Sequence, residues 1–196
     1  MSESNEENHG GIKSQDLEQK NNPEPRDDVL PRLHPTQDVM RAVQGSDLRA
    51  DTIVQSIAFY AVEEDWQSLW NLADSLKREV SVLFDEQGLI WVDIGSTGRV
   101  ALSPPNGSRI PFRLWIHTHP WNAYWSITDK ETLSIATGIL EKALVLGHDH
   151  LVRTVHHEGE SAEASESRLA TGGPLMHWTA EAAMSYATFR QERSVA

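Results

Sequence analysis

The stretch "LWIHTHPWNAYWSITDKETL", residues 114–133, is the most informative part of the chain for predicting the fold. It completes "FRLWIHT" (112–118), an apolar, β-branched and aromatic segment typical of a strand. Pro120 then ends that strand, because proline has no N–H to donate to a β-ladder. Ser126 and Asp129 have the spacing of a helix N-terminal cap. The stretch therefore predicts a strand, an aromatic turn and the start of a helix.

The segments on either side predict further strands and helices from their apolar periodicity. They are a strand at 52–62, an amphipathic helix at 63–78, a hairpin of 79–84 and 89–94, a strand at 99–103, a helix at 128–147 that ends at Gly147, a strand at 150–157 and a closing helix at 178–192. Strands joined by hairpins and mixed with helices predict an α+β fold, with a mixed sheet flanked by helices in a single domain. We expect residues 36–196 to form that domain. Residues 1–35 are acidic, interrupted by prolines and almost free of aliphatic side chains, so we expect them to be disordered.

Composition excludes several classes of function. The 196 residues carry 29 acids against 17 lysines and arginines, a net charge of −12, so nucleic acid is not an expected partner. The chain has no cysteine, which excludes disulfides, thiolate zinc clusters and a cysteine nucleophile. No apolar run reaches the ~18 residues of a membrane span, so we expect no membrane partner and a cytoplasmic protein. The acidic bias fits either a protein of a salt-rich cytoplasm or an ordinary acidic protein.

His117 and His119 are candidate metal ligands. Side chains alternate along a strand, so residues two apart share a face and both imidazoles can converge on one ion. Asp129, in the first turn of the next helix, is a candidate third ligand. Two histidines and one carboxylate leave a fourth position for water, as in a catalytic rather than a structural zinc site.

Each of these pairs also has a structural interpretation. Ser126 and Asp129 can simply cap the helix, although a capping serine can still present its hydroxyl to a metal site. A second histidine pair, His148 and His150, stands near His156 and His157. These four resemble a second metal cluster, but we interpret them as histidines of a strand surface near a helix end. We interpret the pair Trp115 and Ile116 as core residues.

The pattern H-T-H-P followed by S-x-x-D resembles the signature of the JAMM (MPN-plus, JAB) family of zinc metalloproteases. The resemblance covers roughly residues 50–160 and implies an MPN-type, cytidine-deaminase-like fold. It implies one Zn²⁺ per chain, bound by His117, His119 and Asp129. In that family a glutamate opening the strand after the first helix completes the site, here Glu79 in "KREVSVLF". The resemblance makes Glu79 the general base for the attacking water and Ser126 the oxyanion donor.

Two departures from the family pattern bear on the site. Val82 stands where the family commonly has glycine, and six residues, Pro120 to Trp125, separate His119 from Ser126 where seven are typical. We expect the turn to absorb the missing residue by tightening. Glu63 and Glu64 are rivals of Glu79, but at a helix start acids act as ordinary partners of the helix dipole.

The resemblance implies a zinc-dependent peptidase or isopeptidase. Its substrate would be a ubiquitin-like modifier, its conjugates or a sulfur-carrier precursor, cut after the C-terminal glycines. The absence of large insertions makes the chain similar to the minimal prokaryotic and archaeal members. The alternative is a catalytically inactive MPN-type scaffold that binds a protein partner. Trp121, Tyr124 and Trp125 either line a groove for the substrate tail or pack over the turn.

Overall fold

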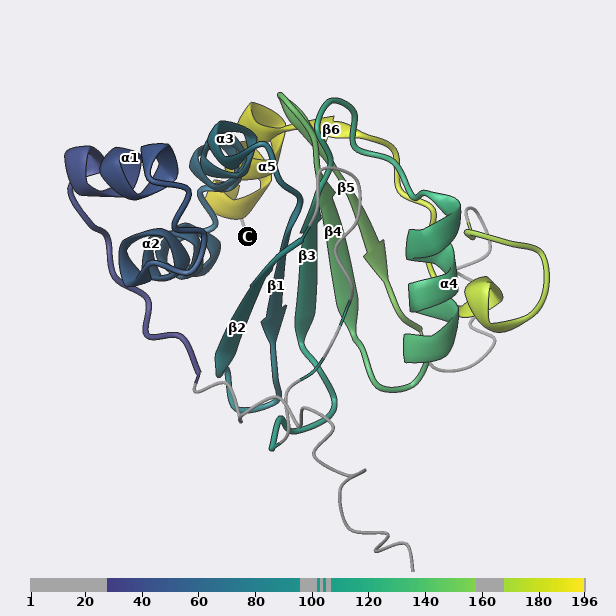
Figure 1. The fold of residues 1–196 in the computed structure, drawn as a ribbon. Coiled ribbons are helices and arrows are strands. Elements are labelled where there is room, and N and C mark those ends of the chain that lie inside the picture. The colour runs from purple at the N-terminus through teal and green to yellow at the C-terminus, as the bar shows by residue number, and fades with distance from the viewer. Residues whose placement is uncertain (1–27, 96–101, 103, 105–106, 158–167, 196) are drawn as a thin grey trace, which may run out of the picture.

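The computed structural model describes residues 28–95, 102, 104, 107–157 and 168–195, which form a mixed six-stranded sheet with five α-helices (Figure 1). The helices are α1 (Thr36–Gln44), α2 (Asp51–Val62), α3 (Trp66–Leu76), α4 (Ile127–Ala136) and α5 (Tyr186–Val195), with a short 3₁₀ helix η2 (Pro174–His177). The strands are β1 (Val80–Phe84), β2 (Ile90–Ile94), β3 (Leu114–Thr118), β4 (Lys142–Leu146), β5 (His150–Val155) and β6 (Met184–Ser185). The predicted α+β class with a mixed sheet is confirmed.

The strand order β2-β1-β3-β4-β5-β6 places β3 in the interior of the sheet. Only the neighbours β3 and β4 run parallel; the other pairs of described strands are antiparallel. A parallel pair needs a crossover connection, and α4 supplies it. The predicted hairpin of residues 79–84 and 89–94 is confirmed as β1 and β2. The crossover matters for function because it brings the start of α4 back to the end of β3.

Two apolar cores lie on the two faces of the sheet. Figure 1 shows α1, α2, α3 and α5 on one face and α4 on the other. Ile116 belongs to the first core, whereas its neighbour Trp115 belongs to the second with Leu133 of α4. Both are buried, as predicted. Because side chains alternate, His117 shares the α4 face with Trp115.

The prediction of a strand at 52–62 is wrong, because this segment is helix α2. Its buried residues include Ile53, Ile57 and Ala61, which recur every four positions and form one helical face against the first core. The β-branched composition misled the prediction, since tertiary packing overrides strand propensity. Helix α1, which was not predicted, packs beside α2 and contributes Val39 to the same core.

The prediction of a helix at 128–147 is correct for its first part and wrong for its second. Helix α4 ends at Ala136, and Gly138 then takes a φ of +84°, which breaks the helical path. The remaining apolar run, 143–146, is fully buried in strand β4. A strand covered on both faces is apolar throughout, so its sequence does not alternate and resembles a buried helix. Gly147 therefore ends a strand rather than a helix.

The two ends of the described chain also refine the predictions. The closing helix predicted at 178–192 begins only at Tyr186, after the short strand β6. The strand predicted at 99–103 lies outside the described residues except for Leu102, and residues 1–27 of the predicted disordered tail lie outside them too. Residues 28–35 are placed: the Val29 N–H donates to Ile90 O at 2.7 Å. No helix in the described part of the chain is long and apolar enough to cross a bilayer.

Candidate metal centre

The two histidines project from the end of β3, and neighbouring elements hold their backbone. The Val80 N–H donates to the Thr118 hydroxyl at 2.8 Å, which ties β1 to the residue between them. The Trp70 indole N–H of α3 donates to the carbonyl of His119, also at 2.8 Å. His117 is 2% exposed and His119 6%. The pair is therefore fixed by the sheet on one side and by α3 on the other.

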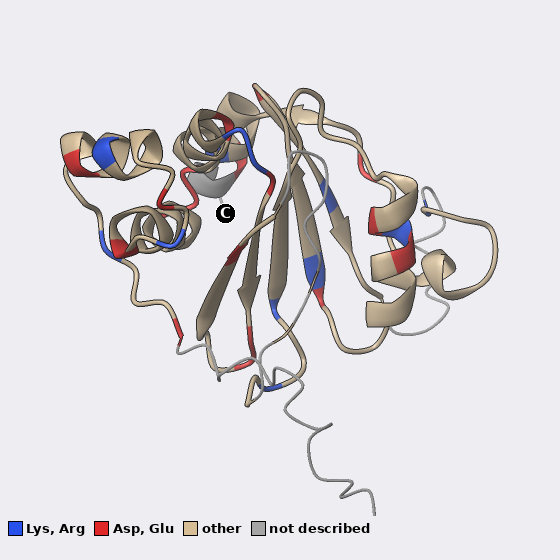
Figure 2. Ribbon diagram, viewed as in Figure 1, with Lys and Arg blue, Asp and Glu red and all other residues tan. Residues whose placement is uncertain are grey.

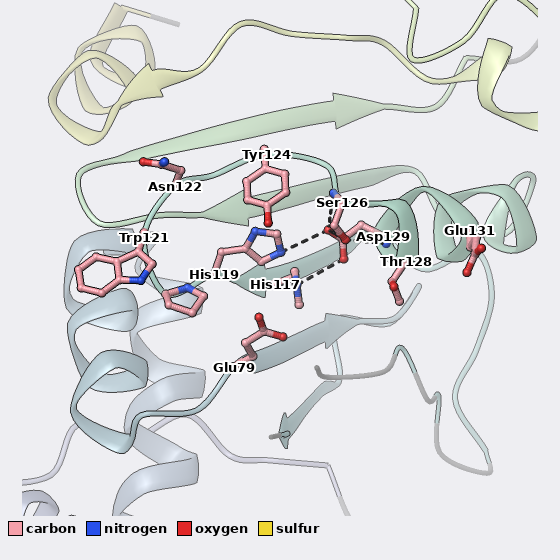
Figure 3. A pocket seen from close by; sticks show the side chains of 11 residues that line it. Glu79, His117, His119, Trp121, Asn122, Tyr124, Ser126, Thr128, Asp129 and Glu131 are labelled. Atoms are coloured by element: carbon pink, nitrogen blue, oxygen red, sulfur yellow. Dashed lines mark hydrogen bonds and ion pairs between the residues drawn. The ribbon is translucent and has the colours of Figure 1, made fainter. Parts of the chain in front are cut away.

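Asp129 reaches both histidines from the first turn of α4. Its Oδ1 lies 3.4 Å from His117 Nε2, and its Oδ2 lies 3.3 Å from His119 Nε2 (Figure 3). Ser126 caps the helix reciprocally: its hydroxyl accepts from the Asp129 N–H, while its own N–H and hydroxyl donate to Asp129 Oδ2 at 2.9 and 2.7 Å. The Asp129 carboxylate therefore completes the predicted helix cap with Ser126 and also contacts the two histidines. The six-residue turn is long enough to bring Asp129 to the pair.

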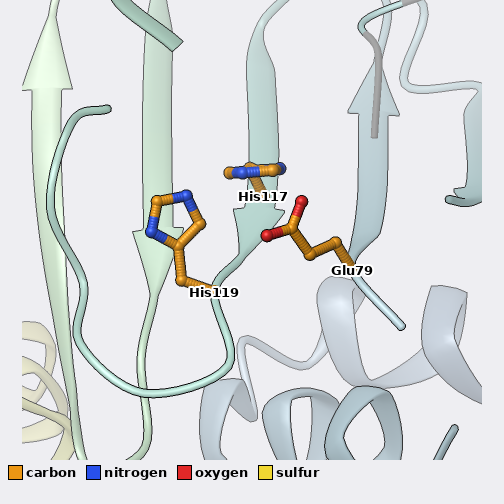
Figure 4. A group of neighbouring side chains, drawn as sticks. All are labelled: Glu79, His117 and His119. Atoms are coloured by element: carbon orange, nitrogen blue, oxygen red, sulfur yellow. The ribbon is translucent and has the colours of Figure 1, made fainter. Parts of the chain in front are cut away.

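Glu79 approaches the histidines from the opposite element, directly before β1. It is 6% exposed, and one oxygen of its carboxylate lies within 4.8 Å of a ring nitrogen of His117 and of His119 (Figure 4). This buried group of three could bind a metal ion, and it differs from the predicted ligand set by having Glu79 in place of Asp129. Figure 3 shows the two carboxylates reaching the histidine pair from β1 and from α4. The candidate centre therefore consists of four residues.

The environment shifts the ionisation of three of these residues. Burial, reinforced by His119, lowers the pKa of His117 to about 4 although Asp129 opposes the shift. Burial raises the pKa of Asp129, but hydrogen bonds from His119 and Ser126 and the nearby His117 outweigh it, and the pKa falls to about 2. Burial also raises the pKa of Glu79, with Asp129 adding to the shift and His119 opposing it. At neutral pH His117 is neutral and Asp129 ionised.

The donor set fits a divalent metal ion. The Nε2 atoms of His117 and His119 face the Asp129 carboxylate at 3.4 and 3.3 Å, and the Nδ1 atoms are buried without a hydrogen-bond partner in the described structure. A neutral imidazole has a lone pair to offer a metal, and a carboxylate with a low pKa stays charged beside it. Nitrogen and oxygen donors of this kind are those of zinc sites without cysteine.

The site lies in an open cavity of about 760 Å³. Its wall includes Trp121 and Tyr124, which are 77% and 56% exposed, and the Tyr124 ring lies edge-on to the His119 ring with 4.7 Å between centroids. Trp125 is buried in the second core. Of the two roles considered for these aromatic residues, Trp121 and Tyr124 line the cavity, whereas Trp125 packs beneath the turn.

No lysine or arginine of the described residues lines the cavity of the centre. Figure 2 shows lysines and arginines dispersed among acids over the described residues. Lys77 and Arg78 immediately precede Glu79, but Lys77 pairs with Asp74 at 3.1 Å. The rival Glu63 is the C-cap of α2 and is absent from the cavity wall.

The downstream histidines have other contacts. His150 Nε2 accepts the Ala123 N–H at 3.1 Å, and the His148 ring meets the Trp70 ring edge-on at 4.9 Å. His150 is therefore more than a surface histidine, which the sequence did not reveal. Trp70 was predicted only as part of an apolar helix face, and nothing in its spacing indicates that its N–H holds the backbone of His119. Within the described residues the only group of three potential ligands is at Glu79.

Comparison of the chain with models of protein families, with curated proteins and with solved structures gave no match. The function is therefore argued from the geometry of the centre.

Proposed function

We propose that the chain is a zinc-dependent peptidase or isopeptidase with an MPN-type fold. It would hydrolyse the bond after the C-terminal glycines of a ubiquitin-like modifier or a sulfur-carrier protein. The observation that carries the proposal is the buried histidine pair with a carboxylate of lowered pKa on one side and one of raised pKa on the other. A ligand and a base need these opposite properties.

His117, His119 and Asp129 would hold one Zn²⁺ per chain. Asp129 Oδ2 already accepts two hydrogen bonds from Ser126, which leaves Oδ1, facing His117, as the oxygen for the ion. The cap thus orients the carboxylate as hydrogen bonds to metal ligands commonly do. Zn²⁺ bound there would supply Lewis acidity, which makes water acidic enough to lose a proton near neutral pH.

Glu79 would act as the general base. Its burial raises its pKa above the usual value, which makes it a better proton acceptor than an exposed glutamate. It would take the proton of the attacking water and return it to the leaving nitrogen. One oxygen of the Glu79 carboxylate lies within 4.8 Å of a ring nitrogen of each histidine, which supports this role. The same closeness makes direct ligation the rival role for Glu79.

Ser126 lines the same cavity and is the proposed oxyanion donor. In that role the Ser126 hydroxyl would turn away from Asp129 Oδ2. The backbone N–H of Ser126 would keep its hydrogen bond to the same oxygen. A preorganised donor of this kind contributes on the order of 3 kcal/mol to the stability of a transition state.

The substrate proposal rests on the shape of the cavity and on the family resemblance. An extended tail could lie between the walls formed by Trp121 and Tyr124 and the Glu79 side of the cavity. Glycines let a backbone approach the buried histidines closely, since they have no side chain to exclude. Backbone pairing with a sheet edge is the usual way to bind such an extended segment.

Hydrolysis of a ubiquitin-like protein fused through its terminal glycines to a short peptide tests the proposal. Zinc-loaded wild type should cleave the fusion, with about one zinc per chain by elemental analysis. Glu79→Gln should keep the zinc and lose ~10²–10⁴-fold in rate, because glutamine cannot accept the proton. Glu63→Gln is the matched control and should keep both. Loss of zinc in Glu79→Gln would make Glu79 a ligand. A wild type that binds no zinc and cleaves nothing would support the inactive scaffold.

A further inference from the structure

Two turns of the chain pack against each other beside the proposed centre. The ligand turn, residues 120–125, separates His119 from Ser126; the clamp turn, residues 147–150, joins β4 to β5. At Gly147 an added Cβ would lie 2.5 Å from Ala123 N and 2.8 Å from Trp121 O, both backbone atoms. Any side chain at Gly147 would therefore displace the ligand turn.

Two hydrogen bonds join the same turns. The His148 N–H donates to Trp121 O at 2.7 Å, and the Ala123 N–H donates to His150 Nε2 at 3.1 Å. His150 Nδ1 lies 2.6 Å from Asp149 Oδ1 and donates to it, which leaves Nε2 as the acceptor. The His150 side chain thus satisfies a backbone N–H of the ligand turn.

The clamp turn is itself anchored by two helices. The Tyr186 hydroxyl, at the start of α5, donates to Gly147 O, and the Gln67 amide of α3 donates to His148 O at 3.0 Å. Trp70 of α3 packs against the His148 ring and also donates to His119 O. The ligand turn is therefore held by α3 at its start and by the clamp turn in its middle.

We propose that Gly147 and His150 are positioning residues that set the distance between His119 and Asp129. The inference rests on the proposed metal site and deepens it. Only six residues join His119 to Ser126, and Ser126 in turn orients Asp129, so a shift of the ligand turn moves one ligand relative to the other. The clamp turn fixes that geometry without touching the ion.

Cobalt titration of the metal-free protein tests the inference, because Co²⁺ absorption reports both affinity and coordination geometry without catalysis. Gly147→Ala and His150→Ala should bind Co²⁺ ~10–100-fold more weakly, as expected for groups that orient ligands, and with an altered spectrum. His150→Gln should recover most of the affinity, since its side-chain oxygen can accept the Ala123 N–H. Hydrogen exchange in the metal-free variants should be faster in the ligand turn.

Gly138→Ala is the matched control. Gly138 has a φ of +84°, so alanine there strains the fold, but an added Cβ would meet nothing within 4 Å. This variant should lose stability and keep the wild-type Co²⁺ affinity and spectrum. Wild-type affinity and spectrum in both Gly147→Ala and His150→Ala would overturn the inference, whether or not the turn exchanges faster. A wild type that binds neither Co²⁺ nor Zn²⁺ would instead overturn the metal site, and the positioning role with it.

Discussion

Acidification of the metal-free protein should reveal the buried state of His117. Burial lowers the pKa of this residue from 6.5 to about 4. As the pH falls below 6.5, the unfolded chain takes up a proton that the folded chain does not, so folding stability decreases. The loss begins near pH 6.5 and is complete once the pH has fallen below the folded pKa of about 4.

The size of the loss follows from the shift. The difference of 2.5 between 6.5 and about 4, at 1.36 kcal/mol per pKa unit, corresponds to about 3 kcal/mol. Glu79 acts in the opposite direction: its pKa is raised, so its cost to folding is relieved as the pH falls through that value. Asp129, whose pKa is lowered, begins to lose its own stabilisation as the pH approaches its ordinary value of 3.8. A Glu79→Gln background removes the opposing contribution of Glu79.

Urea unfolding of Glu79→Gln at about pH 7 and about pH 4 should show a fall of about 3 kcal/mol in the free energy of unfolding. The double variant Glu79→Gln/His117→Phe should show a much smaller fall, because phenylalanine fills the site and does not titrate. Equal falls in the two proteins would refute the burial argument. His117 would then titrate in the folded state near its ordinary pKa of 6.5, and burial would not keep it neutral at lower pH.

Three further predictions concern the same centre and the start of the described part of the chain. His119→Ala should abolish zinc binding measured by chelator competition, whereas His34→Ala should leave it intact, since His34 contacts Gln55 and neither residue lines the cavity of the centre. Ser126→Ala should cost about 1 kcal/mol of stability through the lost cap and also weaken zinc binding; a loss of rate alone would favour a purely oxyanion role. Removing residues 1–27 should leave the melting temperature and turnover unchanged, whereas removing 1–35 should lower stability by about 1–2 kcal/mol, because the contacts of Val29 with β2 are lost. Equal melting temperatures for the two truncations would contradict the packing of 28–35.

The sequence was most informative where periodicity and end signals agree. The helix predicted at 63–78 is α3, Trp66–Leu76, with apolar residues at three- and four-residue steps; the side chain of its N-cap, Asp65, accepts from the Ser68 N–H. The hairpin of β1 and β2 follows from two apolar runs around "DEQG", with Gly88 at a φ of +81°. Local signals of this kind need no knowledge of the rest of the chain.

The errors arose in β4 and α2, where packing rather than the local pattern determines the secondary structure. In β4 every residue from Ala143 to Leu146 is buried, so the strand lacks a polar face to identify it. In α2 the apolar face is wide, and β-branched residues such as Ile53 sit on it. The secondary structure of both segments depends on the parts of the chain that pack against them, and a single sequence does not show that packing.

The site was predictable to the extent that it is local. His117 and His119 share a strand, and Ser126 and Asp129 share a helix turn, so spacing alone indicates each pair. The contact between the pairs depends on the crossover from β3 to α4. The roles of Trp70 and His150 depend on contacts with residues 49 and 27 positions away. No short pattern encodes such contacts.

The reciprocal cap of α4 has a consequence for metal exchange. Ser126 and Asp129 hold each other through bonds between residues three apart, so this half of the centre assembles with the helix and does not require an ion. The free energy of metal binding is then not spent on ordering the carboxylate. An ion could be withdrawn by a chelator and another admitted while the chain stays folded, so one preparation could be reloaded with different metals and compared directly.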